Sequence, residues 1–411
     1  MPVATGRKIC APRQNRRQTD VARPQDPSAR MTVESIAPAA SAVLWGASLI
    51  WLLGTVICAL LQPGKRRIAP SGDALAPVSV VVPTSAVDTP ETAQDRADTL
   101  QSFLGVDYPD VDLVVSVDRA EEGKALTADL MRTYAAEPVR IVAAHRQAHP
   151  NAKVDAMEAG MEAARHDLVL FADDDALVDR EHIANMVRRY QADGGLVSAA
   201  AVGILPQNLA AWFELAFMNG QFARLHLAGD VLGFSGALGK AVLVTRQDLA
   251  RSGGLPGIGG DCCEDAALTR NFKAQGLRVA LSESPVRQPI RRQRFLDVLR
   301  RHRRWLSCRR KYLPVVFVCE ALFSAPVAIA AAYIAAGAFL GQATAGAVAT
   351  ALLWCATDSL FFLLKGWPWS GWTPMAWLLR EAVFLPVWLS ALFARTVTWY
   401  GRRVPVSVEG A

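Results

Sequence analysis

Long apolar stretches near both ends of this 411-residue chain constrain its fold more than any other feature. Ala39–Leu61 contains 23 residues without a charge, and Ala321–Leu340 contains 20. About 20 apolar residues let a helix cross a bilayer, so both stretches are predicted to be transmembrane helices. Ala343–Leu364 is similar, although it carries Asp358. The mixed composition of residues 75–286, between these stretches, predicts one globular domain.

The last apolar stretch is shorter than the others. Ala382–Ala394 has 13 uncharged residues and directly follows Arg380 and Glu381. At that length an interfacial or re-entrant segment fits as well as a membrane span. The predicted order is a disordered tail at 1–35, a transmembrane helix at 36–62, the globular domain at 75–286, a basic interfacial helix at 287–311, a membrane region at 312–400 with two spans plus an interfacial or third span, and a tail at 401–411.

Positive charge is concentrated in one segment. The net charge is +6, and Arg287–Lys311 holds ten Arg and one Lys against a single acid, Asp297. Nucleic-acid binding is one interpretation of such a segment. The positive-inside rule explains it better, because the segment precedes an apolar stretch and Lys65–Arg67 follows the first one. We therefore expect a multi-pass membrane protein, of a bacterial inner membrane, with a cytoplasmic middle domain that meets an anionic membrane surface and binds no nucleic acid.

Residues 75–286 alternate between apolar strands and helical segments. The first strand is Val78–Val82, and we expect Pro83 to end it. Nearly continuous apolar strands are typical of a mostly parallel sheet that is covered on both faces. The alternation predicts the α/β class, with Asp88 starting the first helix and Asp179 capping a later one. The other predicted strands are Val111–Val117, Val139–Val142, Leu168–Ala172 and Leu196–Ala200.

Three consecutive aspartates, Asp173–Asp175, follow the strand at 168–172. A solvated turn could hold them, since Asp is common in turns. A divalent cation could also hold them, because Mg²⁺ and Mn²⁺ prefer carboxylate oxygens. Asp118 ends another strand, and ligands of parallel sheets bind at the carboxyl ends of the strands, which favours the cation. In an extended chain Asp173 and Asp175 would point the same way and Asp174 would face elsewhere.

A second acidic group follows a glycine-rich loop in "GGDCCEDAALTRNF", which begins at Gly259. The pair Glu264 and Asp265 could cap a helix, since acids favour the first turn. The pair could also supply a general base, because neighbouring acids raise each other's pKa towards neutral pH. Cys262 and Cys263 are interpreted as packing residues, because no base is paired with them in the sequence.

A third motif, "RRHRRW", places Arg301, Arg304 and Trp305 on one predicted helix. These residues could simply flank a membrane, with Trp305 as an interface anchor. They could also bind the oxygens of a diphosphate, for which Arg is the preferred partner. "GFSGALGKA" is rejected as a phosphate loop, because five residues rather than four separate Gly233 from Gly239.

Taken in order, these pieces resemble inverting membrane glycosyltransferases of the Rossmann-like GT-A fold, in the family 2 superfamily, and most of all its ceramide glucosyltransferase branch, the family 21 type. The resemblance covers the chain from about residue 77 to its end. Arg301 stands where polysaccharide synthases typically have Gln, which favours the lipid branch. The matching pieces are "VSVVVP", "SFLGVDYPDVDLVVSVD", "PNAKV", "FADDD", "GGDCCED", "RHRRW" and "WYGRRVPVSVEG".

The resemblance implies a role for each matching residue. Asp118 would contact the uracil–ribose side of a UDP-sugar, while Asp173 and Asp175 would serve the ribose and a divalent cation, Mg²⁺ or Mn²⁺. Asp265, with Glu264 beside it, would be the base that deprotonates the acceptor. The other implied donor-binding residues are Asn151, Lys153, Arg301, Arg304 and Trp305.

The function implied by the resemblance is transfer of a hexose, with glucose expected, from a UDP-sugar to the hydroxyl of a membrane lipid. Ceramide is favoured as the acceptor over a hopanoid or diacylglycerol. A processive polysaccharide synthase is an alternative enzyme, although a polymer channel would need more spans after the domain. A basic membrane-surface adaptor is the non-enzyme alternative, and it would need neither a divalent cation nor a hydrolysable donor.

Overall fold

The computed structural model describes residues 33–62, 75–85, 90–119, 121, 123–145, 147–399 and 402–406. The predictions for most of the N-terminal tail, for Lys65–Arg67 and for Asp88 lie outside these residues. A seven-stranded sheet forms the core of the middle domain. Its strands are β1 (Val78–Thr84), β2 (Val111–Val117), β3 (Val139–Ala143), β4 (Leu168–Ala172), β5 (Leu196–Ser198), β7 (Ala241–Thr245) and β8 (Val279–Leu281).

The strands lie in the order β3-β2-β1-β4-β7-β5-β8. Strands β3, β2, β1 and β4 are mutually parallel, and β5 is parallel to β8. Strand β7 alone runs antiparallel to both of its neighbours. The predicted α/β class with a mostly parallel sheet is therefore confirmed. The reversed direction of β7 was not predicted, and it decides which residues reach the functional edge.

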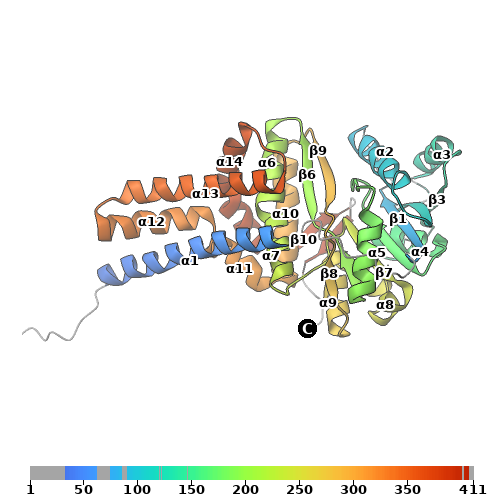
Figure 1. Cartoon of the computed structure of the whole chain (residues 1–411), viewed down its shortest axis with the longest axis horizontal. Coiled ribbons are helices and arrows are strands. Elements are labelled where there is room, and N and C mark those ends of the chain that lie inside the picture. Colours follow the sequence, from blue (N-terminus) through green and yellow to red (C-terminus); the bar gives the residue numbers. More distant parts are fainter. Residues whose placement is uncertain are drawn as a thin grey trace, which may run out of the picture.

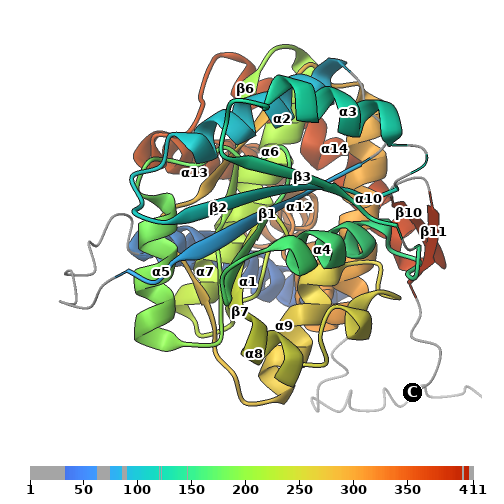
Figure 2. The same cartoon turned by 90° about the vertical axis from the view of Figure 1, so that its right-hand side faces the viewer.

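Helices cover both faces of the sheet, because successive strand residues point to opposite sides. Val80 and Val82 pack on one face against buried residues of α2 (Pro90–Leu104), α3 (Lys124–Thr133) and α5 (His182–Asp193). Val81 packs on the other face. There it joins α4 (Ala152–Ala163), α8 (Arg246–Arg251) and α9 (Glu264–Ala274). Figure 2 shows α2 and α3 on one side of the strands, with α4, α8 and α9 on the other.

Some predicted boundaries differ from those in the structure. Strand β1 continues through Pro83 to Thr84, because parallel pairing with β2 extends over both residues. The residue that precedes α5 is Glu181 rather than Asp179, whose carbonyl instead accepts a hydrogen bond from the backbone of His182. These differences move element ends by one or two residues and leave the order of elements unchanged.

The basic segment 287–311 is not one helix. Its first residues belong to β9 (Val286–Arg291), which pairs in parallel with β6 (Ala201–Pro206) in a separate two-stranded sheet. The helix α10 then runs from Phe295 to Tyr312. The segment at 401–411, which we expected to be a tail, contributes β11 (Arg402–Pro405) to an antiparallel hairpin with β10 (Thr396–Trp399).

A long helical segment follows β6, and it contains a rare π-helix. Helix α6 (Leu209–Phe217) leads into the π-helix η1 (Met218–Ala223), which leads into α7 (Arg224–Val231). The extra residue per turn widens the helix at η1, and such bulges are frequent at functional sites. Figure 1 shows α6, α7 and α10 standing between the sheet and the apolar helices.

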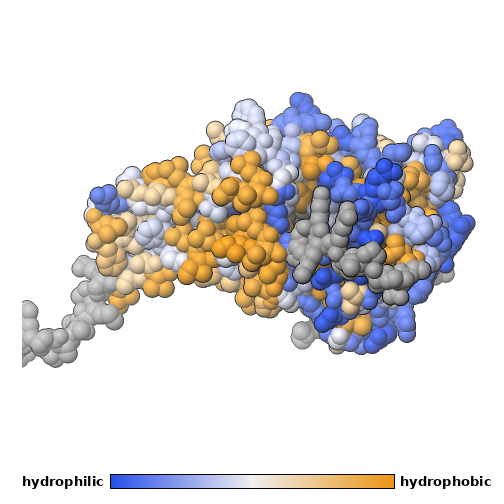
Figure 3. Space-filling model, in the orientation of Figure 1, coloured by the Kyte–Doolittle hydropathy of each residue, from blue (hydrophilic) through white to orange (hydrophobic). Residues whose placement is uncertain are grey.

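Three described helices are long and apolar enough to cross a membrane: Ile36–Leu61 within α1 (Val33–Leu61), α13 (Ala343–Lys365) and α14 (Trp372–Leu392). A fourth candidate is the pair α11 (Pro314–Leu322) and α12 (Ala325–Leu340), which is bent by 44°. Helix α14 has 21 residues, more than the 13 of its uncharged stretch, because it includes Arg380 and Glu381. Apolar side chains cover most of the protruding part of the molecule (Figure 3).

Candidate active site

The three aspartates leave the carboxyl end of β4 in a turn. The chain does not stay extended there, because the N–H of Ala176 donates to the carbonyl of Asp173 over 3.2 Å. The expectation that alternation along an extended chain selects Asp173 and Asp175 is therefore wrong. The two side chains still converge, because both approach the ammonium group of Lys240, and the turn brings them there.

Lys240 was not predicted to belong to the site. Its Nζ lies 3.1 Å from Oδ2 of Asp173 and 2.6 Å from Oδ1 of Asp175. Gln288 of β9 donates a hydrogen bond of 2.7 Å to the other oxygen of Asp175. Burial would lower the pKa of Lys240, but the carboxylates of Asp175 and Asp173 raise it. Lys240 therefore stays cationic and holds the two acids together.

The antiparallel direction of β7 explains why sequence reasoning missed Lys240. Because β7 runs opposite to β4, its first residue, Ala241, pairs with Ala172 at the end of β4. Lys240 is thereby placed beside Asp173, and the Asp173 backbone N–H donates to its carbonyl over 3.3 Å. The available signal was the "GK" of the segment that we rejected as a phosphate loop. We rejected the segment only as a phosphate-binding loop. Gly239 and Lys240 instead contact carboxylates of the site.

A second buried lysine joins the aspartates to the acidic pair on α9. Nζ of Lys153 lies 2.6 Å from Oδ1 of Asp173 and 2.6 Å from Oε1 of Glu264. Asn151 caps α4 by accepting the N–H of Lys153, and its side-chain amide lies 3.3 Å from Oε2 of Glu264. The structure thus brings together four predicted site residues from three separate motifs. Both carboxylate oxygens of Glu264 are therefore bound by Asn151 and Lys153, and Glu264 has a positioning role.

Asp265 occupies the first turn of α9 and receives several hydrogen bonds. The N–H of Gly239 donates to Oδ2 over 2.8 Å, while the N–H of Ala266 and the thiol of Cys263 donate to Oδ1. Burial raises the pKa of Asp265, and the neighbouring Glu264 raises it further. A carboxylate with a raised pKa accepts a proton more readily, which is what a general base requires.

Gly239 makes the approach of its backbone to the acids possible. A Cβ atom there would lie 3.0 Å from both Oε1 of Glu264 and Nζ of Lys153, and 3.5 Å from Oδ2 of Asp265. Any side chain would therefore press on the network. A glycine at this position lets the main-chain N–H reach Asp265.

Asp118 ends β2, two strands away from β4 at the same edge of the sheet. Its side chain is buried, and Nε of Arg119 lies 3.4 Å from its Oδ1. Its backbone N–H donates to the carbonyl of Thr84 at the end of β1 over 3.0 Å. This residue lies at the functional edge as predicted, and its role remains a prediction.

The motif on α10 lies over the edge of the sheet. Arg301 forms an ion pair of 3.0 Å with the fully buried Glu214 of α6. His302, the next residue of α10, lies 3.2 Å from the same carboxylate. Burial would raise the pKa of Glu214, but Arg301 and His302 hold it at about 2. The pair fixes α10 against α6. Trp305 packs edge-on against Phe222 with ring centroids 4.7 Å apart.

Two electrostatic effects connect α10 to the acids. The carboxylate of Asp175 is one of the charges that raise the pKa of Arg301, after the larger effect of Glu214. Burial lowers the pKa of Arg304, and Glu264 is among the groups that oppose this shift. Arg301 and Arg304 therefore lie within electrostatic range of the carboxylates on β4 and α9. The motif supplies positive charge near the edge where a diphosphate would need it.

The carboxylates of Asp173 and Asp175 suit a divalent cation. Both carboxylates contact Nζ of Lys240, and oxygen ligands are those that Mg²⁺ and Mn²⁺ prefer. A divalent cation at this point would therefore take the place of the ammonium group. Among the described residues, no group of three or more His, Cys, Asp or Glu side chains is arranged to hold a metal ion. The two aspartates fit a cation that takes its remaining ligands from substrate phosphates and water.

Comparisons with solved structures give matches of low similarity. A mannosyltransferase from Pyrobaculum calidifontis, solved with GDP-Man and Mn²⁺, is 19% identical over 88% of this chain and 99% of its own, with a TM-score of 0.49. Residues 1–349 of S. aureus TarS, solved with UDP-GlcNAc, are 12% identical over 81% of this chain and 97% of their own, with a TM-score of 0.35.

A family model and one curated relative match this chain. "Ceramide glucosyltransferase 3" of Caenorhabditis elegans is 22% identical over 228 residues, which are 55% of this chain. The chain spans about half the length of that relative, 50% of it. The model of "Glycosyl transferase family 21" matches residues 46–411, a range that contains the whole site and the helices after it. The chain therefore belongs to glycosyltransferase family 21.

Proposed function

We propose that this enzyme transfers a hexose, glucose in the first instance, from a UDP-sugar to the hydroxyl of a membrane lipid, with inversion at the anomeric carbon. The observation that carries the proposal is the position of Asp265. Its carboxylate has a raised pKa and lies beside the Lys153–Glu264 pair, which reaches the aspartates of β4. A base and a cation-binding pair at one sheet edge are what single-displacement transfer needs.

The chemical roles follow from these positions. Asp265 accepts the proton of the lipid hydroxyl while its oxygen bonds to the anomeric carbon of the sugar. The bond from that carbon to the diphosphate oxygen breaks, and UDP leaves. Because one displacement occurs with a single base, the anomeric configuration inverts. Lys153 and Asn151 hold Glu264, which fixes the first turn of α9 and with it the position of Asp265.

The positive groups act on the leaving UDP. Asp173 and Asp175 would hold a divalent cation, which supplies charge neutralisation at the diphosphate when it is bound. Arg301 and Arg304 of α10 lie over the same edge and attract the phosphate oxygens. Asp118, at the end of β2, would contact the nucleoside. Trp305 packs at the side of α10 that faces Phe222 of η1, towards the membrane helices.

The lipid class of the acceptor is proposed from the apolar helices around the site. An acceptor that is dissolved in the bilayer would reach an enzyme whose domain lies against the membrane surface. Ceramide is the first candidate, because the characterised relative is named a ceramide glucosyltransferase. The topology proposed with it has residues 65–311 in the cytoplasm. Reporter fusions after residues 311, 341 and 411 test this topology, and a cytoplasmic reporter signal at 311 is expected.

The decisive experiment uses membranes that contain the full chain. They are incubated with several labelled UDP-sugars and Mn²⁺, and the lipid products are separated and analysed. A single labelled glycolipid, with the β-linkage expected from an α-linked donor, supports the proposal. Label that enters a polymer would point to a polysaccharide synthase instead. UDP-sugar turnover that never labels a lipid in any membrane would remove the lipid acceptor.

A further inference from the structure

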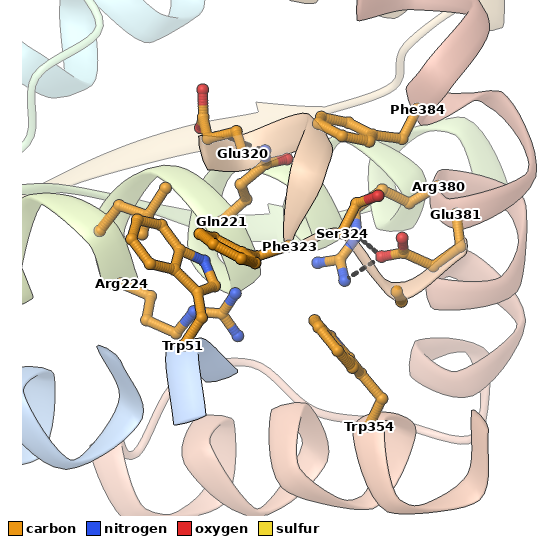
Figure 4. Close-up of a pocket in the computed structure, with 12 residues that line it drawn as sticks. Trp51, Gln221, Arg224, Glu320, Phe323, Ser324, Trp354, Arg380, Glu381 and Phe384 are labelled. Carbon is orange, nitrogen blue, oxygen red and sulfur yellow. Dashed lines mark hydrogen bonds and ion pairs between the residues drawn. The ribbon is translucent and has the colours of Figure 1, made fainter. Parts of the chain in front are cut away.

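A small polar cavity lies among the helices on the membrane side of α10. It is lined by residues of α1, the π-helix η1, α7, the junction of α11 and α12, α13 and α14. Figure 4 shows aromatic rings of Trp51, Phe323, Trp354 and Phe384 around the same space as charged groups. The charged and polar lining residues are Gln221, Arg224, Glu320, Arg380 and Glu381. Charged side chains at the level of apolar helices are costly, and they commonly mark a functional site.

The charges around the cavity balance each other. Arg224 and Arg380 both bind Asp358 of α13, at 2.5 and 2.8 Å. Arg380 also contacts Glu381, and Arg309 of α10 contacts Glu320. The set contains three arginines and three acids, Asp358, Glu320 and Glu381, so it has no net charge. An uncharged polar ligand suits such a cavity better than an anionic head group.

Two polar atoms in the lining are left without a partner. Nε of Arg224 and Oε2 of Glu320 are buried and make no hydrogen bond with any described residue. Both residues are only 4% exposed. A buried donor or acceptor without a partner is destabilising, so a ligand that satisfies both would bind favourably. Amides and hydroxyls both offer a donor and an acceptor on the same group.

The size of the cavity limits which chemical group it can bind. Its volume is about 30 Å³, which is room for one small polar group. The π-helix shapes the wall of the cavity. Gln221 donates to Glu320 over 3.2 Å, and a Cβ at Gly220 would lie 2.5 Å from Nη1 of Arg380.

The cavity is connected to the candidate active site through α10. The guanidinium of Arg309 stacks 3.8 Å from the ring centroid of Phe222, which also packs on Trp305 of the predicted donor site. Arg309 in turn contacts Glu320 in the cavity wall. A lipid bound there would therefore lie directly behind the helix that covers the donor.

We propose that this cavity binds the uncharged polar group, an amide or a hydroxyl, of the acceptor lipid while its chains remain among the membrane helices. The acceptor role rests on the function proposed above. The unpartnered Nε of Arg224 would donate to the carbonyl or hydroxyl oxygen of the lipid. Oε2 of Glu320 would accept from its N–H or O–H. The aromatic rings would cover the adjoining hydrocarbon.

A matched pair of serines allows a clean test. Ser324 lines the cavity, and its hydroxyl donates to the carbonyl of Ala321, three residues earlier. Ser390 of α14 makes the same bond to Val387 but faces outward. Ser324→Leu would fill the cavity, whereas Ser390→Leu would change only the outer surface. Both variants lose the same kind of hydrogen bond, from a serine hydroxyl to a backbone carbonyl. Comparison of their melting temperatures therefore separates an effect on folding from an effect on binding.

The full chain is reconstituted in bilayers with a photoreactive N-acyl amino alcohol, and the labelled peptides are mapped after illumination. A photoreactive fatty acid methyl ester of the same chain length is the comparison lipid. We expect the wild type and Ser390→Leu to be labelled around the cavity by the amino alcohol alone. Ser324→Leu should lose labelling about tenfold, which corresponds to about 1.4 kcal/mol. Equal labelling of the wild type by both lipids would overturn the proposal, even if Ser324→Leu fails to fold.

Transfer of sugar to the lipid is measured on the same samples. If transfer continues while the cavity stays unlabelled, the cavity inference is wrong and the proposed function stands. If the cavity is labelled but no sugar reaches any lipid, the proposed function fails and so does the acceptor role of the cavity. Loss of both labelling and transfer in Ser324→Leu, with donor binding retained, supports the two together.

Discussion

Two buried aspartates at opposite edges of the sheet lie in opposite electrostatic surroundings. Near the start of β2, Asp112 accepts hydrogen bonds from Ser79 at 2.8 Å, from Arg140 and from the N–H of Arg165 at 3.0 Å. Burial would raise its pKa, but these partners lower it. At the other edge of the sheet, burial and Glu264 raise the pKa of Asp265. An acid that is paired with an arginine holds strands together, whereas the acid that lies next to another acid is the one to which we assign the chemistry.

The largest expected effect is a loss of turnover when the aspartate at the functional edge, Asp265, is replaced. Asp265→Asn keeps the size of the side chain but cannot accept a proton, so turnover should fall by about 10²–10⁴. UDP affinity should persist, and stability should change by only about 1 kcal/mol, because most hydrogen bonds can be kept. Turnover, UDP titration and thermal melting measure the three quantities. Glu264→Gln, which retains an acceptor for Lys153, is the milder control, and a fully active Asp265→Asn would remove the base assignment.

Asp112→Asn tests the opposite edge and should give the opposite pattern. It leaves Arg140 without its ionic partner, and breaking such a buried pair is destabilising. We expect a loss of about 2–3 kcal/mol, reduced from the fully buried case because the Arg140 side chain is 32% exposed. Denaturant unfolding measures the loss, and turnover per folded molecule should not change. Normal stability combined with lost turnover would show that the two edges do not divide stability and chemistry in this way.

Replacing single aspartates in the turn after β4 tests which of them contribute to UDP binding at the functional edge. Asp175→Asn should weaken Mn²⁺-dependent UDP binding by roughly 10–100-fold, since Asp175 shares the point that Asp173 and Lys240 approach. Asp174→Asn should be milder, because burial and its acidic neighbours raise the pKa of Asp174 to about 7 and leave it partly uncharged. Calorimetric titration of UDP with and without Mn²⁺ compares them. Equal losses would count against the assigned pair.

The smallest expected effect is a shift of the acidic limb of the kcat/KM profile to higher pH. The proposed base works only when it is deprotonated, so kcat/KM should fall as the pH drops through the raised pKa of Asp265. That limb should lie above the ordinary aspartate value of 3.8. A pH profile of the wild type and of the residual activity of Asp265→Asn measures it. The limb should vanish in the variant, and a limb that is unchanged there belongs to another group.

The sequence predicted the central parallel strands and most of the site, because both depend on local patterns. Continuous apolar runs identified β2 and β4 to the residue, and the polar residues that follow each run fell at the expected edge. Lys240 was missed because strand direction is set by tertiary pairing, which periodicity does not contain. The length of α14 was missed because Arg380 pairs with Asp358 of α13, and contacts between helices are not contained in a local hydropathy pattern.

The hairpin of β10 and β11 has a consequence for how the enzyme is made. Val397 and Val404 of the hairpin are buried against Cys262 and Cys308, in the loop before Asp265 and in α10. A ribosome releases these strands only after every helix of the membrane region has been synthesised. The loop that precedes the proposed base therefore gains its contacts with the hairpin only after the membrane helices have been synthesised. A nascent chain that is still being inserted into the bilayer would lack a complete catalytic centre, so sugar transfer would begin only after assembly in the membrane.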